Sequence, residues 1–142
     1  MDIRFMILPG AILAIYTILV LFKLAILRRN AAHSGRIEVQ YFKLYTGFDV
    51  PDDLRLWERH YNNLLELPIV YYFAIFVAIS LQLTNMLNIS LAWIYLVLRL
   101  FHSIIHLNGN KVKYRFQIFA LSAFTLLTLW FSILYGLFSG WK

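Results

Sequence analysis

The chain has 142 residues, of which 61% are hydrophobic and 14% charged, and its formal net charge is +6. With a mean hydropathy of +0.69 it is too apolar for an ordinary soluble domain, and it is typical of an integral membrane protein. Cysteine is absent, which excludes disulfides, thiolate nucleophiles and cysteine-bound metals. The basic residues are spread along the chain without a nucleic-acid-binding motif, so membrane lipid or an anionic substrate is the expected partner, and nucleic acid is not.

Four long apolar runs follow one another along the chain. Each is about as long as a helix that crosses roughly 30 Å of hydrocarbon at about 1.5 Å per residue. We expect the first run to be a retained helix, because it is longer than the apolar part of a typical signal peptide and lacks a small-x-small cleavage site. The runs cover approximately residues 5–27, 64–83, 89–107 and 116–138.

These runs predict one all-α domain over residues 1–142, a bundle of four membrane-spanning helices. The second helix should begin before its apolar run, around Leu54, with Asp52 or Asp53 as its N-cap. Pro68 should kink this helix near Glu66. The predicted helices cover about residues 5–27, 54–83, 89–107 and 115–138, with a long connection over about 28–53.

Positive charge is distributed unevenly over the three connections. The connection between the second and third helices carries no charge, whereas the other two are basic. Positive residues mark the cytoplasmic side, so both termini should lie outside. Lys113 and Arg115 could serve only to orient the chain. The basic residues are Arg28, Arg29, Arg36, Lys43 and Arg55 in or near the first connection, and Lys111, Lys113 and Arg115 in or near the third.

Two polar stripes interrupt the predicted helices. The spacings i, i+4, i+7 and i, i+3, i+7 each place three side chains on one helix face. Charged and amide groups in apolar helices are costly to insert and are rare unless they line a cavity or pair with one another. The first stripe is Arg59, Asn63 and Glu66, and the second is Arg99, His102 and His106.

The residues alone leave several interpretations of these stripes open. Arg59 could anchor its helix at the headgroups, and Glu66 could form a structural pair with Arg99. The two histidines could join helices by hydrogen bonds, or the stripes could line an ion or proton path. A metal site is disfavoured, because there is no cysteine or HExxH motif, and Glu66 is the one nearby carboxylate.

The stripes, followed by Asn110 and Arg115, resemble the MAPEG family, the membrane-associated proteins of eicosanoid and glutathione metabolism. Members show Arg-x3-Asn-x2-Glu entering helix two and Arg-x2-His/Tyr-x3-Tyr/His leaving helix three. An arginine then opens helix four. All three signatures occur here in order, and the resemblance covers essentially the whole chain. It looks closest to the bacterial members, which implies a bacterial inner membrane.

The resemblance implies a homotrimer that binds glutathione between subunits near the cytoplasmic end. Asn63 and Glu66 would hold the tripeptide, with Glu66 near its amino end, and Arg59 would support them by ion pairing. His102 and His106 match a ligand-contacting pair, and Arg115 matches the arginine that stabilises the glutathione thiolate. The full set of expected site residues is Arg115 for catalysis and Arg59, Asn63, Glu66, Arg99, His102 and His106 for binding.

The expected activity is a glutathione-dependent transfer to hydrophobic electrophiles, or reduction of lipid peroxides. A cation beside a thiol favours the reactive thiolate, and a membrane site suits an apolar acceptor. Two positions depart from the family pattern: Phe116 stands where some members carry a serine, and His106 where a tyrosine is frequent. A carboxylate contact could also come from Lys23, Arg28 or Arg29 at the end of the first helix.

Overall fold

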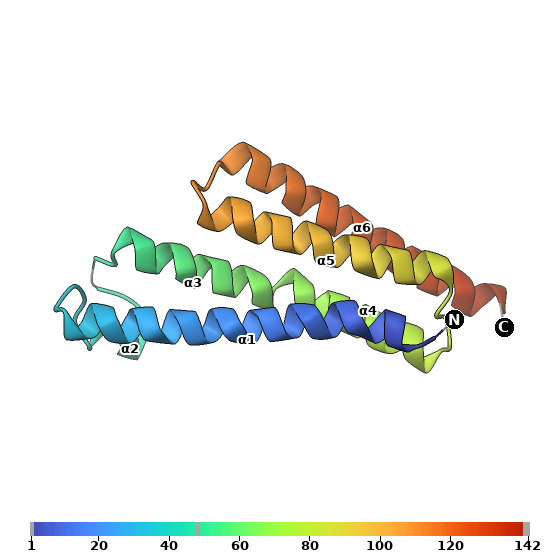
Figure 1. Ribbon diagram of the computed structural model, residues 1–142, viewed down its shortest axis with the longest axis horizontal. Coiled ribbons are helices and arrows are strands. Elements are labelled where there is room, and N and C mark those ends of the chain that lie inside the picture. The colour runs from blue at the N-terminus through green and yellow to red at the C-terminus, as the bar shows by residue number, and fades with distance from the viewer. Residues whose placement is uncertain (1, 48, 141–142) are drawn as a thin grey trace.

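The computed structural model describes residues 2–47 and 49–140, and the regular structure of those ranges is entirely helical (Figure 1). The helices are α1 (Arg4–His33), α2 (Tyr41–Leu44), α3 (Asp52–Leu65), α4 (Leu67–Ser80), α5 (Met86–Leu107) and α6 (Val112–Ser139). Four stretches are long and apolar enough to cross a membrane: α1, α3 together with α4, α5, and α6. The predicted all-α architecture with four membrane-spanning segments is therefore confirmed.

The long helices lie side by side, and the chain starts and finishes at the same end of the bundle (Figure 1). At the opposite end lie the connection from α1 to α3, residues 34–51, and the connection from α5 to α6, residues 108–111. We call this opposite end the basic end, because both basic connections lie there. Their shared position is what a positive-inside topology requires.

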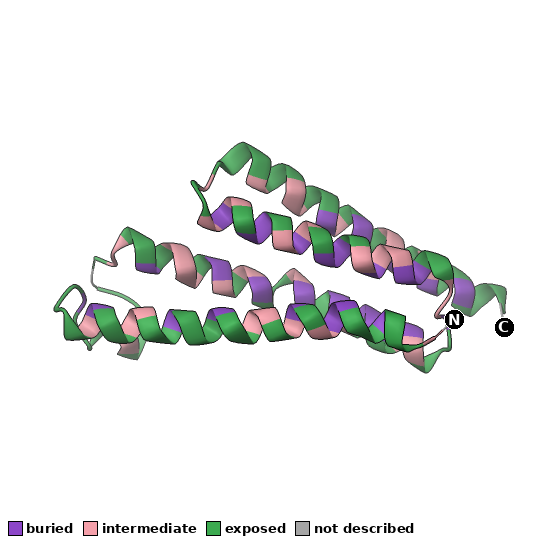
Figure 2. Ribbon diagram, viewed as in Figure 1, coloured by how far each residue is buried: buried purple, intermediate pink, exposed green. Residues whose placement is uncertain are grey.

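Much of each apolar segment faces outward in the single chain (Figure 2). Between 28% and 44% of the most apolar window of each span is buried. Large aromatic side chains are exposed on several helices, among them Phe22 on α1, Phe76 on α4 and Phe131 on α6. Such a surface would aggregate in water, so it must contact lipid or neighbouring chains.

The core of the bundle joins α1, α4 and α5 through closely packed side chains. Tyr71 and Tyr95 are fully buried, and their rings stack with centroids 4.2 Å apart. The Tyr71 hydroxyl donates a hydrogen bond to the Ala92 carbonyl at 2.9 Å, which removes the penalty of burying it. Gly10 lets α1 approach α4, because a Cβ there would lie 2.8 Å from the Cδ1 of Ile75.

The predicted kink in the second span is confirmed as a break in the helix. α3 ends at Leu65 and α4 begins at Leu67, with Glu66 between them at φ −87° and ψ −94°. Pro68 has no N–H to donate to the carbonyl of Leu64, and its ring disfavours a continuous helix at that turn. The break therefore places the Glu66 carboxylate at the start of α4, where the helix dipole stabilises a negative charge.

Several predicted boundaries were wrong. α1 continues to His33, so Arg28 and Arg29 belong to the helix and not to the connection. Neither Asp52 nor Asp53 caps α3: Pro51 occupies the N-cap, and both aspartates lie in the first turn. The remaining differences are the short helix α2 inside the first connection, the start of α5 at Met86, and the start of α6 at Val112.

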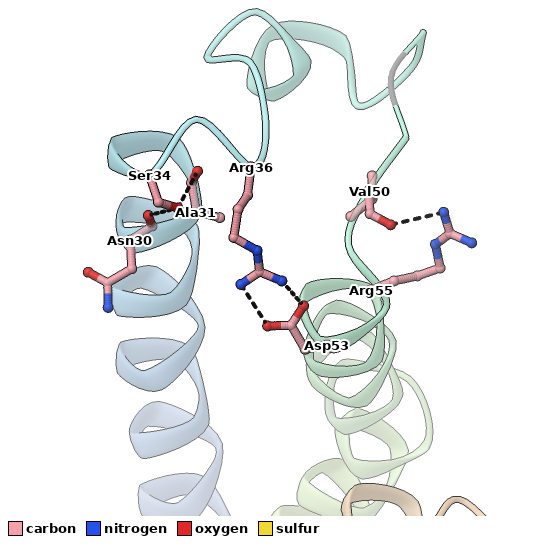
Figure 3. A network of polar contacts seen from close by, with 7 residues as sticks. All are labelled: Asn30, Ala31, Ser34, Arg36, Val50, Asp53 and Arg55. Atoms are coloured by element: carbon pink, nitrogen blue, oxygen red, sulfur yellow. Dashed lines mark hydrogen bonds and ion pairs between the residues drawn. The ribbon is translucent and has the colours of Figure 1, made fainter.

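Ion pairs join the first connection to α3 and join α1 to α3. Arg36 donates two hydrogen bonds to the carboxylate of Asp53, which joins the connection to the first turn of α3 (Figure 3). A less exposed pair lies nearby, in which Arg28 on α1 donates two hydrogen bonds to Glu58 on α3. Tyr41 of α2 donates to the second oxygen of Glu58 at 3.2 Å. Burial, and then the charge of Glu58, raise the pKa of the Tyr41 phenol, so it stays a donor.

The two ion pairs should differ in their contribution to stability. Glu58→Gln leaves Arg28 and Tyr41 without their shared carboxylate, so we expect the free energy of unfolding to fall by about 1–3 kcal/mol. Asp53→Asn breaks a pair whose side chains are about half exposed, so we expect a loss below about 1 kcal/mol. Denaturant unfolding of the purified variants measures both values, and an equal loss for the two would contradict this account.

Candidate functional site

A cavity of about 420 Å³ lies near the basic end between α3, α5 and α6. α3 contributes a polar wall, α5 contributes two histidines, and α6 contributes one arginine and an apolar wall. Six of the seven predicted site residues line this cavity, and the exception is Arg99. The lining residues are Arg59, Asn62, Asn63, Glu66, His102, His106, Val112, Arg115, Phe116 and Phe119.

The tight connection between α5 and α6 positions Arg115. Gly109 and Asn110 have positive φ values of 77° and 44°, which turn the chain back within residues 108–111. The side-chain oxygen of Asn110 accepts a hydrogen bond from the Arg115 guanidinium. Arg115 lies in the first turn of α6, so the positive end of the helix dipole adds to its own charge.

The charged groups of the cavity form no ion pair within the described part of the chain. The ion pairs found within residues 2–47 and 49–140 are Arg4 with Asp2, Arg28 with Glu58, and Arg36 with Asp53. Glu66 and Arg59 are exposed at the cavity, and Arg115 is half-buried. The structural pair of Glu66 with Arg99 that the sequence left open is therefore not formed, and Arg59 does not form the implied ion pair within the described chain.

Arg99 does not line the cavity but holds side chains that do. Its side chain is buried, and Nε donates to the Tyr95 hydroxyl at 2.9 Å. Nη1 donates to the side-chain oxygen of Asn63 at 3.2 Å, across from α5 to α3. The guanidinium also lies over the Phe119 ring at 5.1 Å from its centroid. Arg99 thus holds two side chains that line the cavity, Asn63 and Phe119.

The second stripe continues into a histidine that the sequence analysis missed. His102 and His106 are buried, and their ring centroids are 5.7 Å apart. His60 of α3 is fully buried behind them, 5.3 Å from the His106 ring centroid. A sequence pattern could have pointed to His60: it is three residues after Trp57 and four before Leu64, which places it on the apolar face of α3. Within the described residues, no group of three His, Asp or Glu side chains is arranged to hold a metal ion.

The sequence model described as the MAPEG family matches residues 6–135 of the chain. The match begins in α1 and ends in α6, so it includes every residue that lines the cavity. No curated protein matches the chain, and no solved structure matches it either. The family match therefore rests on the sequence alone, and it covers nearly the full length of the chain.

Exchanging arginine for lysine should separate the supporting role of Arg99 from the exposed position of Arg59. A lysine at position 99 cannot donate to Tyr95 and Asn63 from a planar fork, so we expect Arg99→Lys to lower the free energy of unfolding by about 1–3 kcal/mol. Arg59→Lys keeps its charge at an exposed position and should change stability by less than about 0.5 kcal/mol. Thermal and denaturant unfolding in the same detergent provide the comparison, and a harmless Arg99→Lys would refute the supporting role.

Proposed function

We propose that this chain, which belongs to the MAPEG family, binds glutathione in the cavity between α3, α5 and α6. The chain is an integral, multi-pass membrane protein of a family concerned with eicosanoid and glutathione metabolism. The observation that carries the proposal is the set of three charges at one cavity, Arg59, Glu66 and Arg115. None of them has an ion-pair partner within the described residues.

These charges complement those of glutathione. The tripeptide carries two carboxylates and one ammonium group, so a site needs cations for the acids and a carboxylate for the amine. Glu66 would bind the amino end, and Arg59 together with the side-chain amide of Asn63 would bind the adjoining carboxylate and peptide groups. The N-termini of α4 and α6 both lie at the cavity, because Glu66 starts α4 and Arg115 lies at the start of α6. Their helix dipoles stabilise the carboxylate of Glu66 and add to the positive potential at Arg115.

Arg115 would activate the thiol. A thiol of ordinary pKa is mostly protonated at neutral pH, and a neighbouring cation favours the thiolate. Asn110 holds the Arg115 guanidinium at the cavity, which supports this assignment. Phe116 offers no hydroxyl group, so the activation would depend on charge and not on a second hydrogen-bond donor of that kind.

The acceptor would be a hydrophobic electrophile or a lipid peroxide. The α6 wall of the cavity is apolar, formed by Val112, Phe116 and Phe119, and it continues into the outward face of the helix. In a transfer, the thiolate sulfur bonds to the electrophilic carbon and the displaced group leaves. In a peroxide reduction, two glutathione molecules give one disulfide, while the peroxide takes two electrons and two protons to form an alcohol and water.

We place the site in a homotrimer, at the cytoplasmic end of a bacterial inner-membrane protein with both termini outside. The shared position of the basic connections supports this orientation (Figure 1). The exposure of Arg59 and Glu66 in the single chain leaves the cavity open on one side, where a neighbouring subunit would complete it.

The alternative role as an ion or proton path has less support. Beyond the cavity the core is filled by apolar side chains such as Ala74, Ala92 and Leu129, all fully buried. The stacked rings of Tyr71 and Tyr95 close the space between α4 and α5. Charges at one end followed by a packed core favour a binding pocket that ends at the core over a continuous path across the membrane.

Removing the cation at position 115 should suppress thiolate formation. We expect Arg115→Ala to raise the pKa of bound glutathione by roughly one to three units, because an opposite charge within contact distance lowers a thiol pKa by such amounts. Lys113→Ala is the matched control, since it removes an exposed cation from the same turn that does not line the cavity. Ultraviolet difference absorbance of the thiolate measures both. An unchanged thiolate signal in Arg115→Ala would show that Arg115 does not stabilise the thiolate.

The role of Glu66 can be tested by comparing glutathione with an analogue that lacks the amino group. Glu66→Gln should weaken glutathione binding by roughly ten- to a hundredfold, since a charge-assisted hydrogen bond contributes roughly 1.5–3 kcal/mol. A glutathione analogue that lacks the amino group should bind wild type and Glu66→Gln with similar affinity. Calorimetric titration gives the four dissociation constants, and an equal loss for both ligands would show that Glu66 does not bind the amine.

A further inference from the structure

A line of polar rings, buried at His106 and His60 and partly buried at Tyr16, leads from the cavity to α1. His106 lines the cavity and is 4% exposed. His60 on α3 packs edge-to-face against it, with an interplanar angle of 80°. The Nε2 atom of His60 lies 3.2 Å from the hydroxyl oxygen of Tyr16 on α1, within hydrogen-bonding distance. His60 itself does not line the cavity, and its ring contacts the cavity lining through His106.

The polar atoms of this line are incompletely satisfied. Among residues 2–47 and 49–140, both ring nitrogens of His106 are buried without a hydrogen-bond partner, and so is Nδ1 of His60. Buried polar atoms are nearly always paired, because leaving one unpaired costs about 1–3 kcal/mol. Unpaired nitrogens on a ring that borders a cavity are the atoms that a bound ligand would satisfy.

We propose that Tyr16 and His60 position the ring of His106 for hydrogen bonding to the ligand in the cavity. A neutral imidazole has one donor and one acceptor nitrogen, and the hydrogen bond made at one nitrogen decides the role of the other. The hydrogen bond between the Tyr16 hydroxyl and Nε2, whichever of the two donates, therefore sets which role Nδ1 of His60 plays. The edge-to-face contact then restricts the His106 ring to one orientation against the cavity. The proposal rests on the proposed function for the identity of the ligand, but the arrangement of the three rings does not.

The surroundings explain why the rings need such support. The other ring packed against His60 is Trp57, whose centroid is 6.3 Å away and which faces it at 82°. On the cavity side, the His106 ring contacts His102 in another edge-to-face pair. Aromatic contacts restrict a ring but do not choose between its two nitrogens. For the His60 ring, the hydroxyl of Tyr16 on α1 decides which nitrogen donates and which accepts.

The first test uses the protein without ligand. The chain contains four histidines, and His33 is exposed at the end of α1, so ¹⁵N-labelled histidine gives an internal reference signal. We expect Tyr16→Phe and His60→Phe each to shift the ring-nitrogen resonances of His106 and to leave His33 unchanged. Tyr72→Phe is the matched control, because it also removes one partly buried tyrosine hydroxyl, but one that forms no hydrogen bond to a histidine within the described residues. Unaltered His106 resonances in Tyr16→Phe, which keeps all three rings, would overturn the proposal.

The second test uses glutathione and a double-mutant cycle. We expect His60→Phe to weaken glutathione binding by about tenfold, the effect of one hydrogen bond that is no longer aligned. In a His106→Phe background the same change should have no further effect, because His60 acts through His106. A merely structural role would reduce stability and add to the loss in both backgrounds.

The two tests separate the failure of this inference from the failure of the proposed function. If glutathione does not bind the wild-type protein, the proposed function fails, and the resonances of His106 still decide the positioning role. If glutathione binds and His60→Phe leaves its affinity unchanged, the positioning role is wrong while the function stands. Additive losses in the cycle would also contradict it.

Discussion

A guanidinium buried among apolar helices requires polar partners, and Arg99 receives them for Nε and Nη1 from two helices, while Nη2 has none within the described residues. Its bonds to Tyr95 and Asn63 connect α5 with α3 at the level where the cavity begins. Leaving such a group unpaired in an apolar environment would cost several kcal/mol, so the helices are constrained to keep this registration. The first stripe and the two histidines of the second face one cavity because this contact aligns the helices that carry them. The positions of Asn63 and Phe119 follow directly from the contacts of Arg99.

The break at Glu66 divides the second span into two parts with different tasks. Before the break, α3 carries polar groups toward α5 and α6. After it, α4 is apolar and packs into the core. A continuous helix would leave the carboxylate in the middle of a span, whereas the break gives it a helix N-terminus and access to the cavity. The structure thus separates a cavity with charged side chains near the basic end from the apolar core beyond it.

The sequence predicted those features that depend on local spacing. The four apolar spans, the kink before Pro68 and the stripe Arg59, Asn63 and Glu66 follow from helical periodicity, and they were found as predicted. The helix ends were predicted less well. α1 runs on to His33, beyond the residues that an apolar run can indicate, and α3 is capped by Pro51 and not by an aspartate.

Two further differences depend on tertiary packing, which one sequence does not specify. Arg99 has the spacing of a cavity residue, yet the rotation of α5 turns it beneath the cavity toward Tyr95. His60 has the spacing of a core residue, yet the approach of α1 and α5 gives it Tyr16 and His106 as neighbours. Periodicity assigns a residue to a face of its own helix, and only the neighbouring helices decide what that face contacts.

The central claim is that the charges left unpaired at the cavity bind glutathione. The most direct measurement is a calorimetric titration of the purified, membrane-embedded wild-type protein with glutathione. The account predicts saturable heat that disappears when Arg59 and Glu66 are both replaced by uncharged residues of similar size, since both ends of the ligand then lose their charged partners. Absence of saturable heat with the wild type, or saturable heat of equal size and affinity without these two charges, would contradict it.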